Sequence, residues 1–284
     1  MLQYITWAAD PNIIESPVTV RWYGLMFAIG FIIGYNIIAR MFRHEGGSRK
    51  MVGLTVPMGY GRHNNRQPAW DTCFFLRMGK VLPESYRDTI HLGRWTCQSW
   101  RHYRRDTGGD TLLLITTKRS PLWTFDRLVV PIALVGGLIR LGNLFNSEIF
   151  GHATDLPWGF MFVNSPQWHA MYEGQACHPT QIYEATCYFA LFALLMWMYW
   201  KKNSEERPGL LLGVFFIGCF LSRFLVEFVK NDQVAWESSM SLNMGQLLSI
   251  PFILAGIFFV ARAYTRPRTM LRYPNRFADT GSDR

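Results

Sequence analysis

The stretch WYGLMFAIGFIIGYNIIA, residues 22–39, holds 18 uncharged residues between Arg21 and Arg40. A helix needs roughly 20 predominantly apolar residues to cross the hydrocarbon core of a bilayer. The sequence therefore predicts that this segment spans a membrane, and this prediction sets the fold class for the rest of the chain.

The composition of the whole chain agrees with a membrane protein. Of its 284 residues, 49% are hydrophobic, 15% are aromatic and only 17% are charged, with a formal net charge of +9. The charged share is well below the usual quarter, which excludes a disordered or fibrous chain. The five cysteines form no CxxC pair and no metal-ligand spacing, so neither a disulfide framework nor a metal site is indicated.

Hydropathy predicts four further spans, which make the chain an all-α, polytopic helix bundle with five readable spans. They are expected over residues 122–139, 185–200, 208–229 and 246–261. We expect residues 1–284 to form a single membrane domain, with 267–284 as a cytoplasmic tail.

The basic residues that flank the spans predict the orientation, because such flanks favour the cytoplasm. They can all lie on one side, which leaves the N-terminus and the loop 141–180 outside and the C-terminus in the cytoplasm. Both ends of residues 47–119 are then inside, so this segment must cross the membrane an even number of times. Two crossings there would give seven spans in total.

Two charged residues lie inside the fourth readable span. Arg223 and Glu227 are four residues apart, and hence on one face of a helix. A charge at bilayer depth costs roughly 2.5–3.5 kcal/mol even on permissive scales, so such groups usually pair or line a polar cavity. They could simply neutralise each other, or belong to a polar site.

A second polar region follows the second readable span. Arg140 alone reads as an interfacial anchor, but RLGNLFNSEIFG, residues 140–151, is unusually polar for the end of a span. Arg140 and Arg223 both fall at outward ends of spans, where two guanidiniums could hold a lipid phosphate in bidentate fashion. By default Tyr23 is an aromatic-belt residue and His178 a helix-entry residue.

Five segments in order resemble the prolipoprotein diacylglyceryl transferase family. They are RWYGLMFAIGF, GGLIRLGNLFNSEIFG, CHPTQIYEA, SRFLVEF and SMSLNMGQLLSIP. The resemblance covers roughly residues 15–46 and 120–266. It implies a seven-span bacterial inner-membrane enzyme that needs no cofactor. Such an enzyme moves diacylglyceryl from phosphatidylglycerol to the lipobox cysteine of a preprolipoprotein signal peptide, forming a thioether and releasing glycerol phosphate.

The resemblance also implies the site residues. The catalytic set falls on Tyr23, Arg140, Asn143, Arg223 and Glu227, and the phosphatidylglycerol site on Arg140, Asn143, Glu148, Gly151 and Arg223. Asn146 also stands at a motif position. We expect Glu227 to orient Arg223, and Gly151 to allow a close backbone approach. The partners implied are membrane lipids and the lipoprotein precursor, with no nucleic acid. One departure is Cys219, where the family commonly has an aromatic residue.

Residues 47–119 depart most from the family, because they lack its H-G-G motif and an R-L-G element. They hold 13 Lys or Arg against 5 Asp or Glu and show no helical or strand periodicity. A one-base shift, with codons of our choice, turns residues 91–108 into I-W-E-G-G-L-A-S-H-G-G-I-I-G-V-I-L. Two of its glycines are forced by Trp95-Thr96 and Trp100-Arg101. The same shift turns residues 58–70 into an apolar run that ends in R-L-G.

We therefore interpret residues 47–119 as translated out of frame, and predict that the chain as written is inactive and poorly inserted. The codon of the motif histidine straddles Ser99 and Trp100, so no residue here takes its role, and neither His91 nor His102 is given one.

Three other functions stay open at this stage. An anion transporter or channel could use Arg140, Arg223 and Glu227 as its path, although no internal repeat is found. A nucleic-acid binder could use the basic, aromatic segment 47–119. A noncatalytic relative of the family could bind lipid without transferring it.

Overall fold

The computed structural model describes residues 4–14, 20–45, 121–202, 204–231 and 242–267. Nearly all of them belong to one compact unit, residues 1–41 with 122–272, and the second unit contains residues 42–121 and 273–284. The anomalous segment 47–119 and the tail, apart from its first residue, lie outside the described residues. The paragraphs below concern the first unit.

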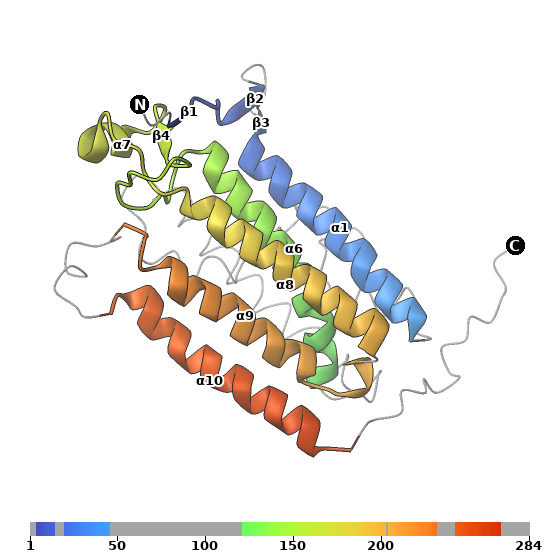
Figure 1. Cartoon of the computed structure of the whole chain (residues 1–284). Coiled ribbons are helices and arrows are strands. Elements are labelled where there is room, and N and C mark those ends of the chain that lie inside the picture. The colour runs from blue at the N-terminus through green and yellow to red at the C-terminus, as the bar shows by residue number, and fades with distance from the viewer. Residues whose placement is uncertain (1–3, 15–19, 46–120, 203, 232–241, 268–284) are drawn as a thin grey trace, which may run out of the picture. The chain divides into compact units, whose positions relative to one another are not determined.

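Five helices lie side by side in this unit (Figure 1). They are α1 (Trp22–His44), α6 (Pro121–Phe145), α8 (Thr180–Lys202), α9 (Leu210–Val226) and α10 (Met244–Thr265). The short 3-10 turn η3 (Ser204–Glu206) lies between α8 and α9. The predicted polytopic helical fold is confirmed, with all five readable spans found as helices.

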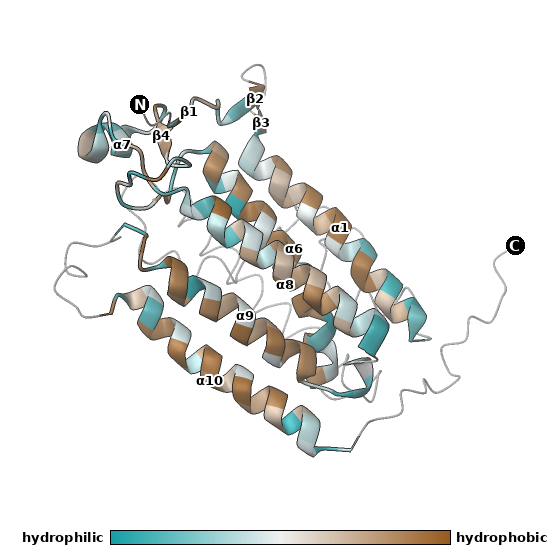
Figure 2. Ribbon diagram, viewed as in Figure 1, coloured by the Kyte–Doolittle hydropathy of each residue, from teal (hydrophilic) through white to brown (hydrophobic). Residues whose placement is uncertain are grey.

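Four of these helices, α1, α6, α8 and α10, are long and apolar enough to cross a membrane. The fifth, α9, is apolar but has only 17 residues. Hydrophobic residues predominate along α9 and α10 in particular (Figure 2). The chain is therefore an integral membrane protein by the length and composition of its helices.

The observed helix boundaries differ from the predicted ones where polar residues are involved. We expected the second readable span to end at Arg140, but α6 continues to Phe145. We expected the third to begin after Glu184, but α8 begins at Thr180. A prediction from hydropathy ends each of these two spans where a charged residue occurs. In the structure Arg140 and Glu184 lie within their helices and pair with each other between α6 and α8.

A small globular layer covers one end of the bundle. In it β1 (Ile5–Trp7) pairs in parallel with β4 (Phe160–Phe162), and β2 (Asn12–Ile14) pairs antiparallel with β3 (Val20–Arg21). The helix α7 (Pro166–Tyr172) begins at Ser165, whose side chain accepts a hydrogen bond from the Trp168 amide. This layer has its own apolar core of six buried residues, Leu144, Phe150, Phe160, Phe162, Trp168 and Cys177.

Close helix contacts hold the bundle together. A Cβ on Gly213 of α9 would lie 2.8 Å from the carbonyl oxygen of Gly256 in α10, so the two backbones almost touch. A Cβ on Gly137 of α6 would lie 2.6 Å from the ring of Phe189 in α8. Small residues at such contacts let membrane helices approach closely, and dispersion then stabilises the pair. The first contact sets the distance between α9 and α10, and the second sets the distance between α6 and α8.

A buried carboxylate fixes the first turn of α9. Asp126 of α6 is fully buried and accepts hydrogen bonds from the backbone amides of Gly209 at 2.6 Å and Leu212 at 2.8 Å. The first amides of a helix lack partners within it and carry a partial positive charge, so an anion there is favourable. Asp126 therefore anchors the start of α9 to α6.

We expect Asp126→Asn to lower the free energy of unfolding by about 3 kcal/mol. Hydrogen bonds to a charged group contribute about 1.5–3 kcal/mol each. The asparagine amide has one acceptor oxygen, so it can keep one of the two bonds in a weaker form, and its NH2 group cannot accept the other. Denaturant unfolding of the detergent-solubilised protein measures the change. The matched control is Asp155→Asn, at an exposed position of the loop between α6 and β4. Equal stability of the two variants would contradict the anchoring role of Asp126.

Candidate active site

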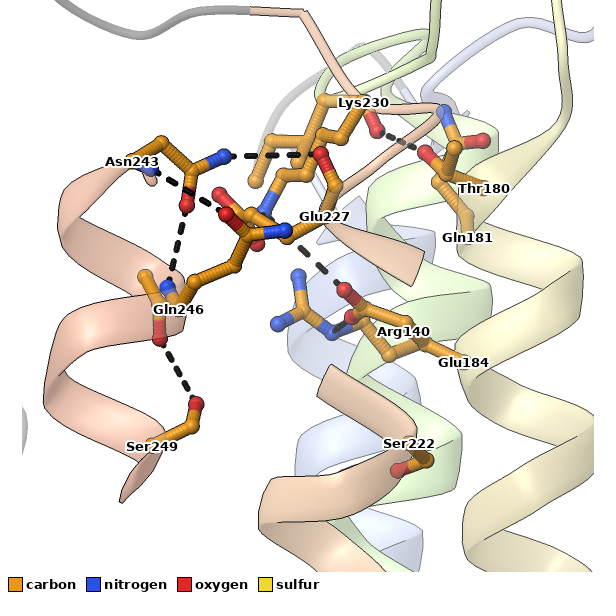
Figure 3. A network of polar contacts seen from close by, with 12 residues as sticks. Arg140, Thr180, Gln181, Glu184, Ser222, Glu227, Lys230, Asn243, Gln246 and Ser249 are labelled. Carbon is orange, nitrogen blue, oxygen red and sulfur yellow. Dashed lines mark hydrogen bonds and ion pairs between the residues drawn. The ribbon is translucent and has the colours of Figure 1, made fainter. Parts of the chain in front are cut away.

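The polar residues of five segments meet at one end of the bundle. At this end α6 and α9 finish, while α1, α8 and α10 begin. Figure 3 shows the side chains that converge there from α6, α8, α10 and the end of α9. Because the hydrophobic helices bury this end, its charged groups contact one another, and the contacts define a candidate active site.

An ion-pair network forms the centre of this site. The Arg140 guanidinium pairs with Glu184 of α8, and the two side chains point toward each other in Figure 3. The Lys230 ammonium lies 3.9 Å from Oε1 of Glu184 and 3.6 Å from Oε2 of Glu227. Glu184 and Lys230 are only 1% and 3% exposed. The network thus joins α6, α8 and the segment after α9 through buried charges.

Arg223 lies in the last turn of α9 and is partly buried. Both Arg223 and Arg140 interact electrostatically with Lys230, and both also interact with Tyr188 of α8 and Cys219 of α9. The structure therefore brings the two predicted arginines to one region of the bundle.

The expected orientation of Arg223 by Glu227 is not what the structure shows. The ion pair of Glu227 is with Lys230, three residues further on. The reason is that α9 ends at Val226, and the Glu227 carboxyl lies against Gly245 of α10, where an added Cβ would be 2.6 Å from its carbon. The two residues do not simply neutralise each other within one helix.

The start of α10 supports Glu227 from the other side. Asn243 and Gln246 form a capping box, in which each side chain accepts a hydrogen bond from the backbone amide of the other. The side-chain amide of Asn243 also donates a hydrogen bond to the backbone carbonyl oxygen of Glu227 at 3.4 Å. Such a reciprocal cap fixes the first turn of a helix. The cap of α10 therefore helps to fix the backbone of Glu227, which carries the carboxylate of the ion-pair network.

The structure places Tyr23 and Asn143 near the end of α6. A Cβ on Gly142 would lie 2.9 Å from the ring of Tyr23, so the first turn of α1 contacts the last turn of α6. Asn143 is buried, and its carbonyl oxygen accepts a hydrogen bond from the Glu148 amide. Tyr23 thus contacts the helix turn that separates Arg140 from Asn143.

The loop after α6 is tightly bound to α8. Asn146 donates to the Glu148 carboxylate at 3.1 Å, and Gln181 donates to the Glu148 carbonyl at 2.7 Å. Ser147 and Ile149 both have positive φ angles, a conformation that is uncommon outside glycine and is found at functional sites. The predicted Glu148 is therefore held beside the first turn of α8.

Gly151 makes the close backbone approach that the sequence predicts. It forms an antiparallel bridge with Lys230, and its amide donates to the carbonyl of His178. A Cβ there would overlap the carbonyl oxygen of Val229 and lie 2.9 Å from the Cβ of His178. Only glycine fits between these two segments, and the contact fixes Lys230 at the ion-pair network.

We expect Gly151→Ala to displace the segment 229–230 and to abolish binding of an anionic lipid at the site, because the methyl group has no space. Binding of phosphatidylglycerol by the reconstituted variant measures this loss. The control is Gly24→Ala, where an added Cβ has nothing within 4 Å. If the Gly151 variant bound lipid as the control does, the close approach would have no bearing on the site.

Two titratable residues lie in the layer beside this site. Burial lowers the pKa of the His178 imidazole, and the neighbouring His152 lowers it further. Burial raises the pKa of the Cys177 thiol to about 11. The Cys177 thiol therefore stays protonated near neutral pH and is a poor nucleophile. His178 precedes α8, as predicted, and its Nδ1 lies 3.3 Å from the Tyr183 hydroxyl.

Sequence reasoning missed Glu184, Lys230 and Tyr188. Glu184 and Lys230 stand at the ends of hydrophobic runs, where charged residues are ordinary, and Tyr188 is one of 12 tyrosines in the chain. The only available signal for Glu184 was its place in CHPTQIYEA, one of the five segments quoted above. Among the described residues, no group of three or more His, Cys, Asp or Glu side chains could hold a metal ion.

The comparisons with known proteins agree with one another. The sequence model described as prolipoprotein diacylglyceryl transferase matches residues 108–262. A protein of Porphyromonas gingivalis named phosphatidylglycerol–prolipoprotein diacylglyceryl transferase is 42% identical over 288 positions, covering 94% of this chain and 97% of the relative. The chain belongs to the prolipoprotein diacylglyceryl transferase family.

Two further relatives of this transferase family carry the same name. A protein of Tolumonas auensis is 34% identical over 88% of this chain and 94% of its own length. One of Chloroherpeton thalassium is 33% identical over 90% of this chain and 93% of its own length. These names describe transferases of lipoprotein maturation and give no support to a transporter or channel.

Proposed function

We propose that this chain is a phosphatidylglycerol–prolipoprotein diacylglyceryl transferase. It moves diacylglyceryl from phosphatidylglycerol to the lipobox cysteine of a preprolipoprotein. The observation that carries the proposal is the largely buried network of Arg140, Arg223 and Lys230 with two carboxylates, in a member of this family. Buried cations at one end of a membrane bundle are suited to the phosphate of an anionic lipid.

In the proposed reaction the cysteine sulfur attacks the glycerol carbon that carries the phosphate. A sulfur–carbon bond forms and the carbon–oxygen bond breaks, with its electron pair leaving on glycerol phosphate. Negative charge grows on the phosphate as it leaves, so Arg140 and Arg223 bind the transition state more strongly than the substrate. Both guanidiniums present planar forks that match phosphate oxygens.

The other predicted residues complete the site. We propose that Asn143 donates a hydrogen bond to the lipid headgroup, and that Tyr23 positions the headgroup or relays the thiol proton. Glu148 and Gly151 shape the outer side of the phosphatidylglycerol site. In place of orienting Arg223, Glu227 positions Lys230.

The thiol must lose its proton before attack, because a cysteine thiol has a pKa of about 8.5 and only the thiolate is a good nucleophile. A base must therefore accept the proton. The family's histidine motif would supply a rival base to Tyr23, but its position lies outside the described residues and outside the reading frame as written.

We also propose a location in the bacterial inner membrane with the N-terminus outside and the C-terminus in the cytoplasm. The basic flanks of the helices support this orientation. It places the ion-pair network at the outward end, where a secreted precursor presents its cysteine.

Residues 47–119 are, in our proposal, an out-of-frame segment between compensating shifts. In support, the family's sequence model begins its match at residue 108, after most of the segment. The longer alignments with the relatives cross it, as they would for a gene that keeps its overall length. Sequencing the gene across codons 45–120 tests this. Bases that confirm the present codons and exclude the shifted reading would reject it.

The activity is tested by reconstituting the frame-restored chain with phosphatidylglycerol and a lipobox peptide. The peptide should gain the mass of a diacylglyceryl group, and glycerol phosphate should appear in equal amount. A peptide whose cysteine is replaced by serine is the control. Lipid binding without any thioether would identify a noncatalytic relative and reject the proposed transfer.

A further inference from the structure

Lys230 is a buried cation to which the resemblance assigns no role. It is 3% exposed, and the bridge between its backbone and Gly151 fixes its position. Its ammonium lies 3.6 and 3.9 Å from the nearest oxygens of Glu227 and Glu184, which is longer than a hydrogen bond. An ammonium has three protons to donate, so Lys230 can turn them toward a further acceptor in the site.

The charges of the network do not balance by themselves. Among the described residues, its cations are Arg140, Arg223 and Lys230, and its anions are Glu184 and Glu227. One positive charge is therefore in excess in a largely buried cluster. Within the described residues this excess charge has no counter-charge, which is costly in a buried site, and one negative charge on a ligand would balance it. A phosphodiester supplies one.

The same arrangement disfavours a zwitterionic headgroup. An ammonium on the lipid would need a carboxylate, but Glu184 already pairs with Arg140 and Lys230, and Glu227 with Lys230. The Lys230 ammonium would also repel it directly. Without Lys230 the cluster would be neutral, with a carboxylate exposed to the headgroup. It would then match a lipid that carries both a phosphate and an ammonium.

We propose that Lys230 is a specificity-determining residue that makes the site accept an anionic glycerophospholipid and reject a zwitterionic one. This rests on the proposed function, since it concerns the lipid donor of that reaction. Arg140 and Arg223 hold the phosphate of either lipid, whereas Lys230 distinguishes the rest of the headgroup through its charge.

The experiment compares two lipids with identical acyl chains, phosphatidylglycerol and phosphatidylethanolamine. Each displaces a fluorescent phosphatidylglycerol from the full-length chain in phosphatidylcholine nanodiscs, with the chain in both its written and frame-restored forms. We expect Lys230→Met to lower the preference for phosphatidylglycerol by about tenfold or more, the loss expected for a charge-assisted hydrogen bond in a buried site. Lys230→Arg should retain the preference, because it keeps the charge.

The control is Lys201→Met, at an exposed position in the last turn of α8, which should change neither affinity. Thermal unfolding of each variant shows whether it is folded. The proposal is overturned if the frame-restored wild type shows no preference for phosphatidylglycerol, if its Lys230→Met variant keeps the preference, or if its Lys230→Arg variant is folded and loses it.

This experiment can fail independently of the test of the proposed function. A frame-restored wild type that forms the thioether, with a Lys230→Met variant that still discriminates, would reject the role of Lys230 alone. Discrimination that depends on Lys230, in an enzyme that never forms the thioether, would reject the transfer alone.

Discussion

Restoring the reading frame across codons 45–120 is expected to turn an inactive polypeptide into an active transferase. The chain as written carries a charged, aperiodic segment where the topology requires two crossings, and it lacks the histidine motif. The restored segment would supply two apolar runs and that motif together. Thioether formation on a lipobox peptide, with equal amounts of each purified form in phosphatidylglycerol vesicles, measures the gain.

The control for this comparison changes the same segment without changing the frame. A chain with synonymous codons across residues 47–119 encodes the written sequence and should stay at background. Membrane insertion is scored separately by protease protection. Detectable turnover by the chain as written would contradict the prediction, and so would a restored chain that inserts but stays inactive.

Arg140→Lys is expected to lower turnover of the frame-restored enzyme by about 100-fold, the loss typical when one preorganised electrostatic group is removed from an active site. Lysine keeps the charge but loses the planar fork that pairs with Glu184 and can bind two phosphate oxygens. Steady-state kinetics with phosphatidylglycerol as the varied lipid measures the change. Most of it should fall on kcat, because charge grows on the phosphate as it leaves.

The matched control is Arg207→Lys, before α9 at the other end of the bundle, where the guanidinium lies over the Tyr264 ring. It makes the same chemical change away from the site and should leave turnover within about twofold, as expected of independent positions. Unchanged turnover in Arg140→Lys would remove this residue from the phosphate site.

The sequence predicted the helices of the bundle well, because crossing a membrane requires long apolar runs that hydropathy detects directly. It did not predict the four strands β1, β2, β3 and β4, which are only two or three residues long. The pairing of β1 with β4 is also long-range, as between Ile5 and Phe160. Nor did it predict that α6 continues through Arg140, since the stabilising partner, Glu184, comes from another helix.

The candidate site was predictable only in part for the same reason. Motifs within one segment pointed to Arg140, Asn143 and Gly151, and the structure gives Gly151 the close backbone approach that was expected. The pairing of Glu227 with Lys230 depends on where α9 ends and on the position of Gly245, which no local pattern contains. Contacts between helices decide which charges meet, and a single sequence does not specify them.

The length of α9 has a consequence for the surrounding bilayer. Its 17 residues extend about 25 Å at 1.5 Å per residue, less than the roughly 30 Å of a typical hydrocarbon core. Asp126 fixes the first turn of α9, and Glu184 pairs with Lys230 just after the last turn. The helix therefore cannot relieve the difference in length by sliding along its axis. Lipids beside α9 are then expected to thin locally. Their headgroups would sink toward the two arginines, which shortens the path of a donor lipid from the leaflet into the enzyme.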